Sequence, residues 1–174
     1  YYFGSKEALA RELVRDGARR SDRERRRRLD ALERAGGPRS PAEAIRVIVA
    51  PETERLRPDA PPVGFGHMRF VAGLQGPHRR LLSAAFEDGL NEGYLRCQRH
   101  LRRLLPGVPD AAMRRRLVFL NLFLGTSLAA REAAFEADPS GGALWGRPEA
   151  IEDLIAAAAA LVAGGANPEH GARD

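Results

Sequence analysis

The chain has 174 residues, a formal net charge of +5 and a single cysteine. This length suits one domain with a sizeable buried core, and a hydrophobic share of 44% argues against disorder. One cysteine excludes an internal disulfide, and no run of about 18 apolar residues suggests a membrane span. The first residues carry no basic leader followed by an apolar stretch, so we expect a cytoplasmic protein.

The hydropathy pattern predicts helices along the whole chain, because no stretch alternates strictly between apolar and polar residues. The first predicted helix begins at Ser5, a residue type suited to an N-cap, and ends near Arg34. The second begins at Ser40-Pro41-Ala42-Glu43, which fits a capping box with proline at the first helical position. Pro51 falls inside that second helix and predicts either a kink or its end.

Four further helices are predicted, at Val63–Leu74, from Pro77 to about Leu105, at Asp110–Phe135, and from Pro148 to Gly164. The helix at Asp110–Phe135 is apolar nearly all round between Leu117 and Leu128, so it must be covered on more than one side. The fold class expected from this pattern is an all-α bundle of about six helices.

The most informative segment is the first nine residues, which read Tyr1-Tyr2-Phe3-Gly4-Ser5-Lys6-Glu7-Ala8-Leu9. This segment resembles the signature that closes the helix-turn-helix head of TetR (tetracycline-repressor-like) transcriptional regulators. In that family, aromatic residues end the recognition helix, and a Ser/Asn-Lys-Glu-x-Leu segment opens the next helix. The resemblance implies that Tyr1, Tyr2 and Lys6 contact DNA phosphates, since a phenol donates hydrogen bonds and a lysine adds charge near helical N–H groups.

The resemblance also implies a domain organisation and a mechanism. Residues 1–4 would end the DNA-binding head, residues 5–165 would form the effector-binding and dimerisation domain, and residues 166–174 would be a flexible tail. The expected function is that of a ligand-responsive repressor, released from its operator DNA by a small effector. The first two helices of the head and most of its recognition helix are expected to lie outside this sequence.

A second similarity concerns the chemistry of the effector. The segments Met68-Arg69-Phe70, Gly76-Pro77, Leu104 to Pro109 and Arg116 to Phe119 are similar to the C-terminal domain of TetR regulators of fatty-acid metabolism. This similarity implies an apolar or acyl-type effector. Arg69 and Arg116 lie in apolar surroundings and are expected to pair with Glu87, Asp88 or Glu92, with an anionic effector as the functional alternative.

Bulky and polar side chains of the middle helices are the candidates for an effector pocket, with ordinary core packing as the alternative for each. Asn121 sits among apolar neighbours, so we expect it to be buried and to bond a ligand, a backbone carbonyl or water. The candidate pocket residues are Phe65, Met68, Phe70, Phe86, Asn91, Tyr94, Asn121, Phe123 and Ser127.

The two C-terminal helices, about 110–135 and 148–163, are expected to pair with their copies in a second subunit as a four-helix bundle. The reason is the large apolar surface of the helix at about 110–135, which one subunit cannot cover. The expected interface residues are Leu117, Leu120, Leu124, Leu128, Ile151, Leu154, Ile155, Ala158, Leu161 and Val162.

Enzymatic and metal chemistry find little support in the sequence. Cys97 and His100 lie three residues apart, but no second pair of ligands has a suitable spacing, so we expect neither a metal site nor a cofactor. No nucleophile elbow or phosphate-binding glycine loop occurs, so we expect no catalysis. The alternative function is a helical small-molecule-binding or structural dimer module without a DNA role.

Overall fold

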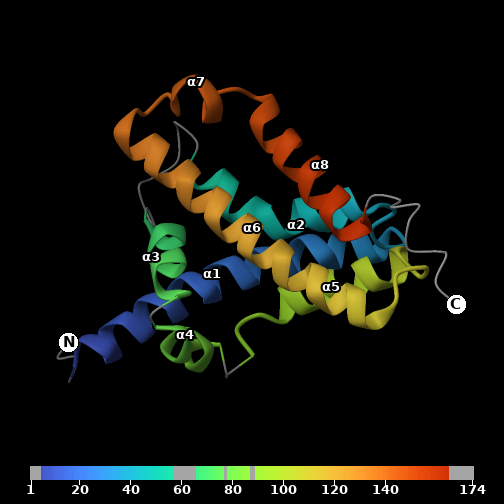
Figure 1. Cartoon of the computed structure of the whole chain (residues 1–174), viewed down its shortest axis with the longest axis horizontal. Helices are drawn as coiled ribbons and strands as arrows, with labels where there is room; N and C mark the ends of the chain where they lie inside the picture. The colour runs from blue at the N-terminus through green and yellow to red at the C-terminus, as the bar shows by residue number, and fades with distance from the viewer. Residues whose placement is uncertain (1–4, 57–65, 77, 87–88, 165–174) are drawn as a thin grey trace, which may run out of the picture.

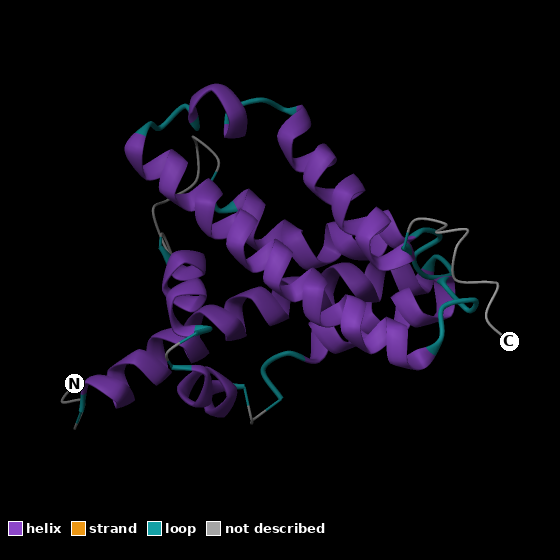
Figure 2. Ribbon diagram, in the orientation of Figure 1, coloured by secondary structure: helices purple, strands orange, loops and turns teal. Residues whose placement is uncertain are grey.

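The computed structural model describes residues 5–56, 66–76, 78–86 and 89–164, and every regular element within them is a helix (Figure 2). The all-α class predicted from the sequence is confirmed for these residues. The helices are α1 (Lys6–Arg34), α2 (Pro41–Glu54), α3 (His67–Leu74), α4 (Arg79–Ala85), α5 (Glu92–Leu104), α6 (Asp110–Ala137), α7 (Gly142–Trp145) and α8 (Glu149–Ala163).

The helices differ from the six predicted ones in two places. The single helix predicted from Pro77 to Leu105 is divided into α4 and α5, and Gly89 between them has a φ of +71°, which a right-handed helix does not accept. The four-residue helix α7 follows α6 and was not predicted. The predicted residues Val63 to Phe65 lie outside the described part, and α3 begins at His67.

Local sequence signals place both ends of α1. The hydroxyl of Ser5 accepts a hydrogen bond from the N–H of Ala8 at 3.1 Å, as an N-cap should. At the other end, Gly36 has a φ of +98° and donates to Glu33 O, while Gly37 donates to Leu32 O at 2.8 Å. These two bonds form a Schellman motif, which satisfies carbonyls that the helix end would otherwise leave free.

The N-terminal cap of α2 that the sequence predicts at Ser40 is confirmed, and Ser40 makes the expected contact. Its hydroxyl accepts from the N–H of Glu43 at 3.2 Å, and the Glu43 carboxylate accepts from the N–H of Arg39 at 2.8 Å. Pro51 does not end the helix, which continues to Glu54. The Arg55 side chain donates from Nε to the carbonyl of Pro51 at 2.8 Å, so this last turn has a side-chain hydrogen bond of its own.

Helix α6 is the centre of the fold, and α2, α3, α7 and α8 all contact it (Figure 1). The main core lies between α2, α5, α6 and α8 and includes Ile45, Leu101, Leu120 and Ile155, each at most 2% exposed. A smaller apolar cluster around Val14 joins α1 to α3 and α4. The N-terminal end of α1 projects from this body (Figure 1).

Three helix ends are capped by side chains of other helices. Neither α3 nor α5 has a side-chain cap of its own. The Glu132 carboxylate of α6 accepts from the N–H of Arg69 at 3.0 Å, and Asp22 of α1 accepts from the N–H of Gly93 at 2.6 Å. At the C-terminal end of α8, Arg116 donates to the carbonyls of Val162 and Ala163 at 3.1 and 2.7 Å. Charge opposite to each helix dipole therefore joins α6 to α3 and α8, and α1 to α5.

The expected dimer residues face the core of the single chain, which corrects the sequence-based expectation. Ile151 and Leu161 are half-buried, and both pack against that core. The other eight are at most 7% exposed, so they are unavailable to a second copy: Leu117, Leu120, Leu124, Leu128, Leu154, Ile155, Ala158 and Val162. The apolar side chains that α6 does expose are Val118, Phe119 and Leu122, which are 55%, 55% and 46% exposed.

By length and composition, α6 is the one described helix that meets the requirements of a membrane span. Of its most apolar 18-residue window, 39% is buried inside the chain. Core helices with large apolar surfaces satisfy the same criteria, so this property does not decide between a membrane and an interior position.

At Gly93, helix α5 lies directly against α1. A Cβ atom there would lie 2.8 Å from the Cβ of Arg25 and 3.2 Å from the backbone N of Arg26. We therefore expect Gly93→Ala to lower the free energy of unfolding by about 1–3 kcal/mol, because the helices must move apart. The measurement is chemical denaturation followed by circular dichroism.

The matched control is Gly73→Ala in α3, where a Cβ would meet no atom within 4 Å. Alanine stabilises helices relative to glycine, so this variant should gain about 0.5 kcal/mol. Equal stability of the two variants would contradict the close contact between α1 and α5.

Candidate functional site

The apolar pocket candidates divide between the two cores and do not line one cavity. Met68, Tyr94 and Phe123 pack against the main core, whereas Phe70 and Phe86 pack against the smaller cluster around α1, α3 and α4. Burial raises the pKa of Tyr94. These placements favour the packing alternative for each residue. Phe65 lies outside the described residues.

The polar pocket candidates lie nearer the surface. Asn121 is exposed on α6, so the expectation that it is buried among apolar neighbours is wrong. The reason is that α6 buries the face carrying Leu117, Leu120 and Leu124, and Asn121 lies at the exposed edge of that face. Asn91 and Ser127 are half-buried, and the Asn91 side chain does not cap α5.

A buried polar cluster joins three helices in the interior and is the strongest candidate site. It consists of Ser21 and Arg25 of α1, Glu52 and Arg55 at the end of α2, and His67 at the start of α3. Ser21 is 2% exposed and Glu52 is 4% exposed, so both have left water almost entirely. Such burial requires partners, because an unpaired charge in an apolar interior is strongly unfavourable.

Glu52 is the centre of the hydrogen bonds in this cluster. The Ser21 hydroxyl donates to Glu52 Oε1 at 2.5 Å, and Arg25 Nη2 lies 3.5 Å from the same oxygen. Arg55 forms an ion pair with Glu52 Oε2 and also donates to the Ser21 hydroxyl at 3.0 Å. The Glu52 carboxylate thus contacts Ser21 and Arg25 of α1 and Arg55 at the end of α2.

His67 enters the same region against the backbone of α1. A Cβ at Gly17 would lie 2.1 Å from Cε1 of the His67 ring, so only glycine leaves room for the imidazole. Burial lowers the pKa of His67, and the neighbouring cations Arg55, Arg20 and Arg25 act in the same direction, while Glu52 opposes them. The histidine is therefore held neutral at a contact between α1 and α3.

Glu132 lies beside this cluster and caps α3. Burial raises the pKa of its carboxyl group, and the backbone N–H groups of Arg69 and Met68 act against that shift. Arg69 itself forms an ion pair with Glu136. Arg116 caps α8, and neither arginine pairs with Glu92, which contacts Arg99 instead. The other two expected partners, Glu87 and Asp88, lie outside the described residues.

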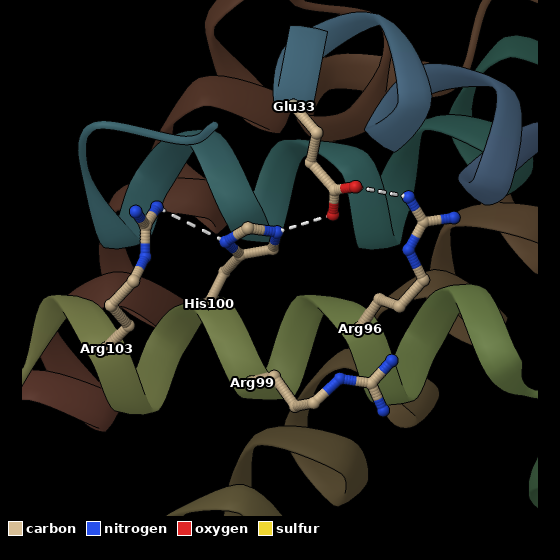
Figure 3. Close-up of a pocket in the computed structure, with 5 residues that line it drawn as sticks. All are labelled: Glu33, Arg96, Arg99, His100 and Arg103. Carbon is tan, nitrogen blue, oxygen red and sulfur yellow. Dashed lines mark hydrogen bonds and ion pairs between the residues drawn. The ribbon is translucent and has the colours of Figure 1, made fainter. Parts of the chain in front are cut away.

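A shallow surface pocket of about 390 Å³ lies between α1 and α5 and is lined by Glu33, Arg96, Arg99, His100 and Arg103 (Figure 3). His100 Nε2 lies 2.8 Å from Glu33 Oε1, and Arg96 donates to Glu33 Oε2 at 2.6 Å. Arg103 lies 3.3 Å from His100 Nδ1. An arginine N–H can only donate, so Nδ1 accepts, and Nε2 carries the proton that is donated to Glu33.

The charges of this surface pocket are largely paired within the protein. Arg96 also contacts Asp30 at 2.8 Å, and Arg99 contacts Glu92 at 2.7 Å. Arg103 donates to the carbonyl of Pro38 at 3.2 Å. Arg96 and His100 lower the pKa of Glu33 through their hydrogen bonds. These contacts connect α5 to α1 and the following loop, so the pocket serves as a polar link between elements.

The described residues offer no three His, Cys, Asp or Glu side chains placed to hold a metal ion. His100 faces Glu33 and Arg103, and Cys97 is fully buried. Burial raises the pKa of the Cys97 thiol to about 12, so it stays protonated and unreactive near neutral pH.

Sequence reasoning missed the residues of the buried polar cluster. Glu52 follows an apolar run of α2, and a carboxylate directly after buried residues is a signal that could have suggested its burial. Ser21 and His67 carry no such signal, because their burial depends on which helices meet them. The pocket candidates were chosen for size and apolarity, whereas the site is polar.

Comparison of the chain with protein-family models, with curated proteins and with solved structures found no match in any of the three. The geometry of the chain itself is therefore the basis for assigning a function.

His67 gives the interior a pH dependence that can be measured. The unfolded chain binds a proton at the ordinary histidine pKa of 6.5, whereas burial disfavours that proton in the folded chain. Stability is thus lost as the pH falls below 6.5. Glu132 acts oppositely, because its raised pKa stabilises the folded chain at low pH. We expect the melting temperature to fall less between about pH 7.5 and 5.5 in His67→Gln than in the wild type.

The control is His78→Gln, which changes an exposed histidine before α4. It should retain the wild-type difference between the two melting temperatures. The same fall in His67→Gln as in His78→Gln would show that the buried imidazole does not couple stability to pH.

Proposed function

We propose that the chain is the effector-binding and dimerisation domain of a ligand-responsive, DNA-binding transcriptional repressor of the TetR type. The observation that carries the proposal is the continuity of α1 with the opening motif. The segment Tyr1 to Leu9 resembles the end of a helix-turn-helix head, and Ser5 within it is the N-cap of a 29-residue helix. That helix passes directly from the motif into the interior of the bundle.

The two ends of α1 have different surroundings, as a connecting helix requires. Leu9 and Leu13 are 38% and 51% exposed on its first turns, an apolar surface that a DNA-binding head would cover. Val14 is fully buried, and Ser21 lies in the buried polar cluster. At a rise of 1.5 Å per residue, the 16 steps from Ser5 to Ser21 span about 24 Å.

The proposed mechanism is a shift between two positions of α1. An effector bound in the helical body would act by changing the contacts that Ser21 and Gly17 of α1 make with α2 and α3. Because α1 is one continuous helix, such a change would move its N-terminal end and the head attached to it. The effector must bind the DNA-free state more tightly than the DNA-bound state, or the equilibrium does not shift.

A homodimer is the second part of the proposal, since two heads about one DNA turn apart are needed to read a palindromic operator. The apolar stripe of Val118, Phe119 and Leu122 on the outer face of α6 is the surface we assign to the second copy. Exposed alanines of α8, such as Ala157 and Ala160, would allow helices to approach closely. The partners are then operator DNA, an effector and a second copy.

The DNA-binding part is tested with the complete gene product and a labelled fragment of its own upstream DNA at two salt concentrations. We expect tight binding that survives an excess of unrelated DNA. Lys6→Gln should weaken binding to all sequences and reduce the salt slope by about 0.9, because one phosphate contact is lost.

The matched control for Lys6 is Arg34→Gln, which changes an exposed residue at the opposite end of α1 and should leave binding unchanged. Binding no stronger than that to unrelated DNA would contradict the DNA-binding role. It would favour the alternative, a helical small-molecule-binding or structural dimer module.

The dimer is tested by the double variant Phe119→Glu, Leu122→Glu. Negative charges on the exposed stripe should prevent a second copy from covering it, so light scattering should give half the wild-type mass at an unchanged helical content. Leu144→Glu, at a position 64% exposed on α7, is the control and should stay dimeric. A wild-type monomer, or a double variant that stays dimeric, would contradict the assigned surface.

A further inference from the structure

Five side chains with polar or charged groups are buried among the described residues, namely Ser21, Asp22, Glu52, Arg131 and Glu132. Four of them have a partner that explains their burial. Asp22 and Glu132 cap helices, and Ser21 and Glu52 bind each other. Arg131 makes no hydrogen bond or ion pair with any residue that the structure describes.

Arg131 lies on α6, is 6% exposed and has two buried N–H groups, at Nε and Nη1, without an acceptor. The carbon of its guanidinium group lies 4.7 Å from the centre of the Phe135 ring, one helical turn later. Its neighbour Glu132 turns to the start of α3 and does not pair with it. Burial lowers the pKa of Arg131, and the charge of Glu132 acts in the opposite direction.

A buried guanidinium that forms no ion pair with a described residue is unfavourable, and an aromatic ring offsets only part of its lost hydration. The Phe135 ring attracts the cation but offers no oxygen atom to the two N–H groups. Nε–H and Nη1–H point to different sides of the guanidinium, so one oxygen of a carboxylate, phosphate or sulfonate can accept from either of them. An anion would supply an acceptor and, unlike a carbonyl, a counter-charge as well.

Arg116 on the same helix shows how the chain satisfies an arginine when the role is structural. Its Nη1 donates to two carbonyls at the end of α8. Arg131, four turns further along α6, has no such acceptors. Arg116 is thus a helix cap, whereas Arg131 has no structural partner of that kind.

We propose that Arg131 binds the anionic head group of an amphiphilic effector whose apolar part lies against the Phe135 ring. This inference rests on the proposed effector role of the helical body and names the chemical class of the ligand. It distinguishes an acidic amphiphile from a neutral apolar one.

The segment that covers Phe135 allows such a ligand to reach the position. The ring contacts Gly141, where a Cβ would lie 2.6 Å from Cζ of Phe135. Gly141 is the only buried residue between Asp138 and Arg147, a stretch that includes α7. A segment with so few buried contacts opens at low free-energy cost compared with the core.

The test compares two dyes with the same ring system. Anilinonaphthalene sulfonate carries a sulfonate, and N-phenylnaphthylamine does not. We expect the wild-type chain to bind the sulfonate dye more tightly in a fluorescence titration. Arg131→Met should weaken that binding roughly tenfold or more and leave the affinity for the neutral dye unchanged, because only the charged contact is lost.

Two controls separate an anion site from a structural role. Arg116→Met should leave both dye affinities unchanged but lower the melting temperature, because it removes the cap of α8. Dye-free Arg131→Met should melt at or above the wild-type temperature, because an uncompensated buried charge is removed.

Three results would overturn the proposal. They are a wild type that does not prefer the sulfonate dye, an equal loss for both dyes in Arg131→Met, and an unchanged affinity for the sulfonate dye in that variant. No DNA enters this experiment, so a failure of DNA binding and a failure of the anion site are observed independently.

Discussion

The arrangement of the bundle depends on charged side chains that cap helices other than their own. Asp22 satisfies the start of α5, Glu132 satisfies the start of α3, and Arg116 satisfies the end of α8. The backbone N–H or C=O groups at a buried helix end cannot bond to water, so they need a side chain as a partner. These contacts determine where α3 and α5 can begin, and hence where α4 and the smaller apolar cluster lie.

Buried polar groups also need partners in the interior, and the buried polar cluster lies beside the apolar core because its members supply them to one another. Glu52 is buried because Ser21, Arg25 and Arg55 surround it, and His67 is buried because Gly17 leaves room for its ring. All of these contacts except the Glu52–Arg55 ion pair end on α1. A change in the buried polar cluster therefore acts directly on α1, the helix that begins in the segment Tyr1 to Leu9. This coupling is the physical basis of the proposed switch.

Arg131 differs from the other four buried polar residues because no described residue forms a hydrogen bond or ion pair with it. A carboxylate on a neighbouring helix would have paired with it, as Glu136 pairs with Arg69. The position instead combines a desolvated cation with an aromatic face, two features that suit the two ends of an amphiphilic acid. The buried polar cluster and Arg131 are both charged. For this reason, choosing candidate site residues by the size and apolarity of their side chains did not identify them.

The sequence by itself determined the all-α class, the capped start of α1 at Ser5, its end near Arg34, and the capped start of α2 at Ser40, because these signals act within a few residues. Which face of α6 points inward was decided only by tertiary structure. An almost uniformly apolar helix has no polar side to identify its exposed face, so Leu120 became core and Asn121 became surface. The buried polar cluster was equally beyond prediction, since Ser21, Glu52 and His67 meet only when three helices pack together.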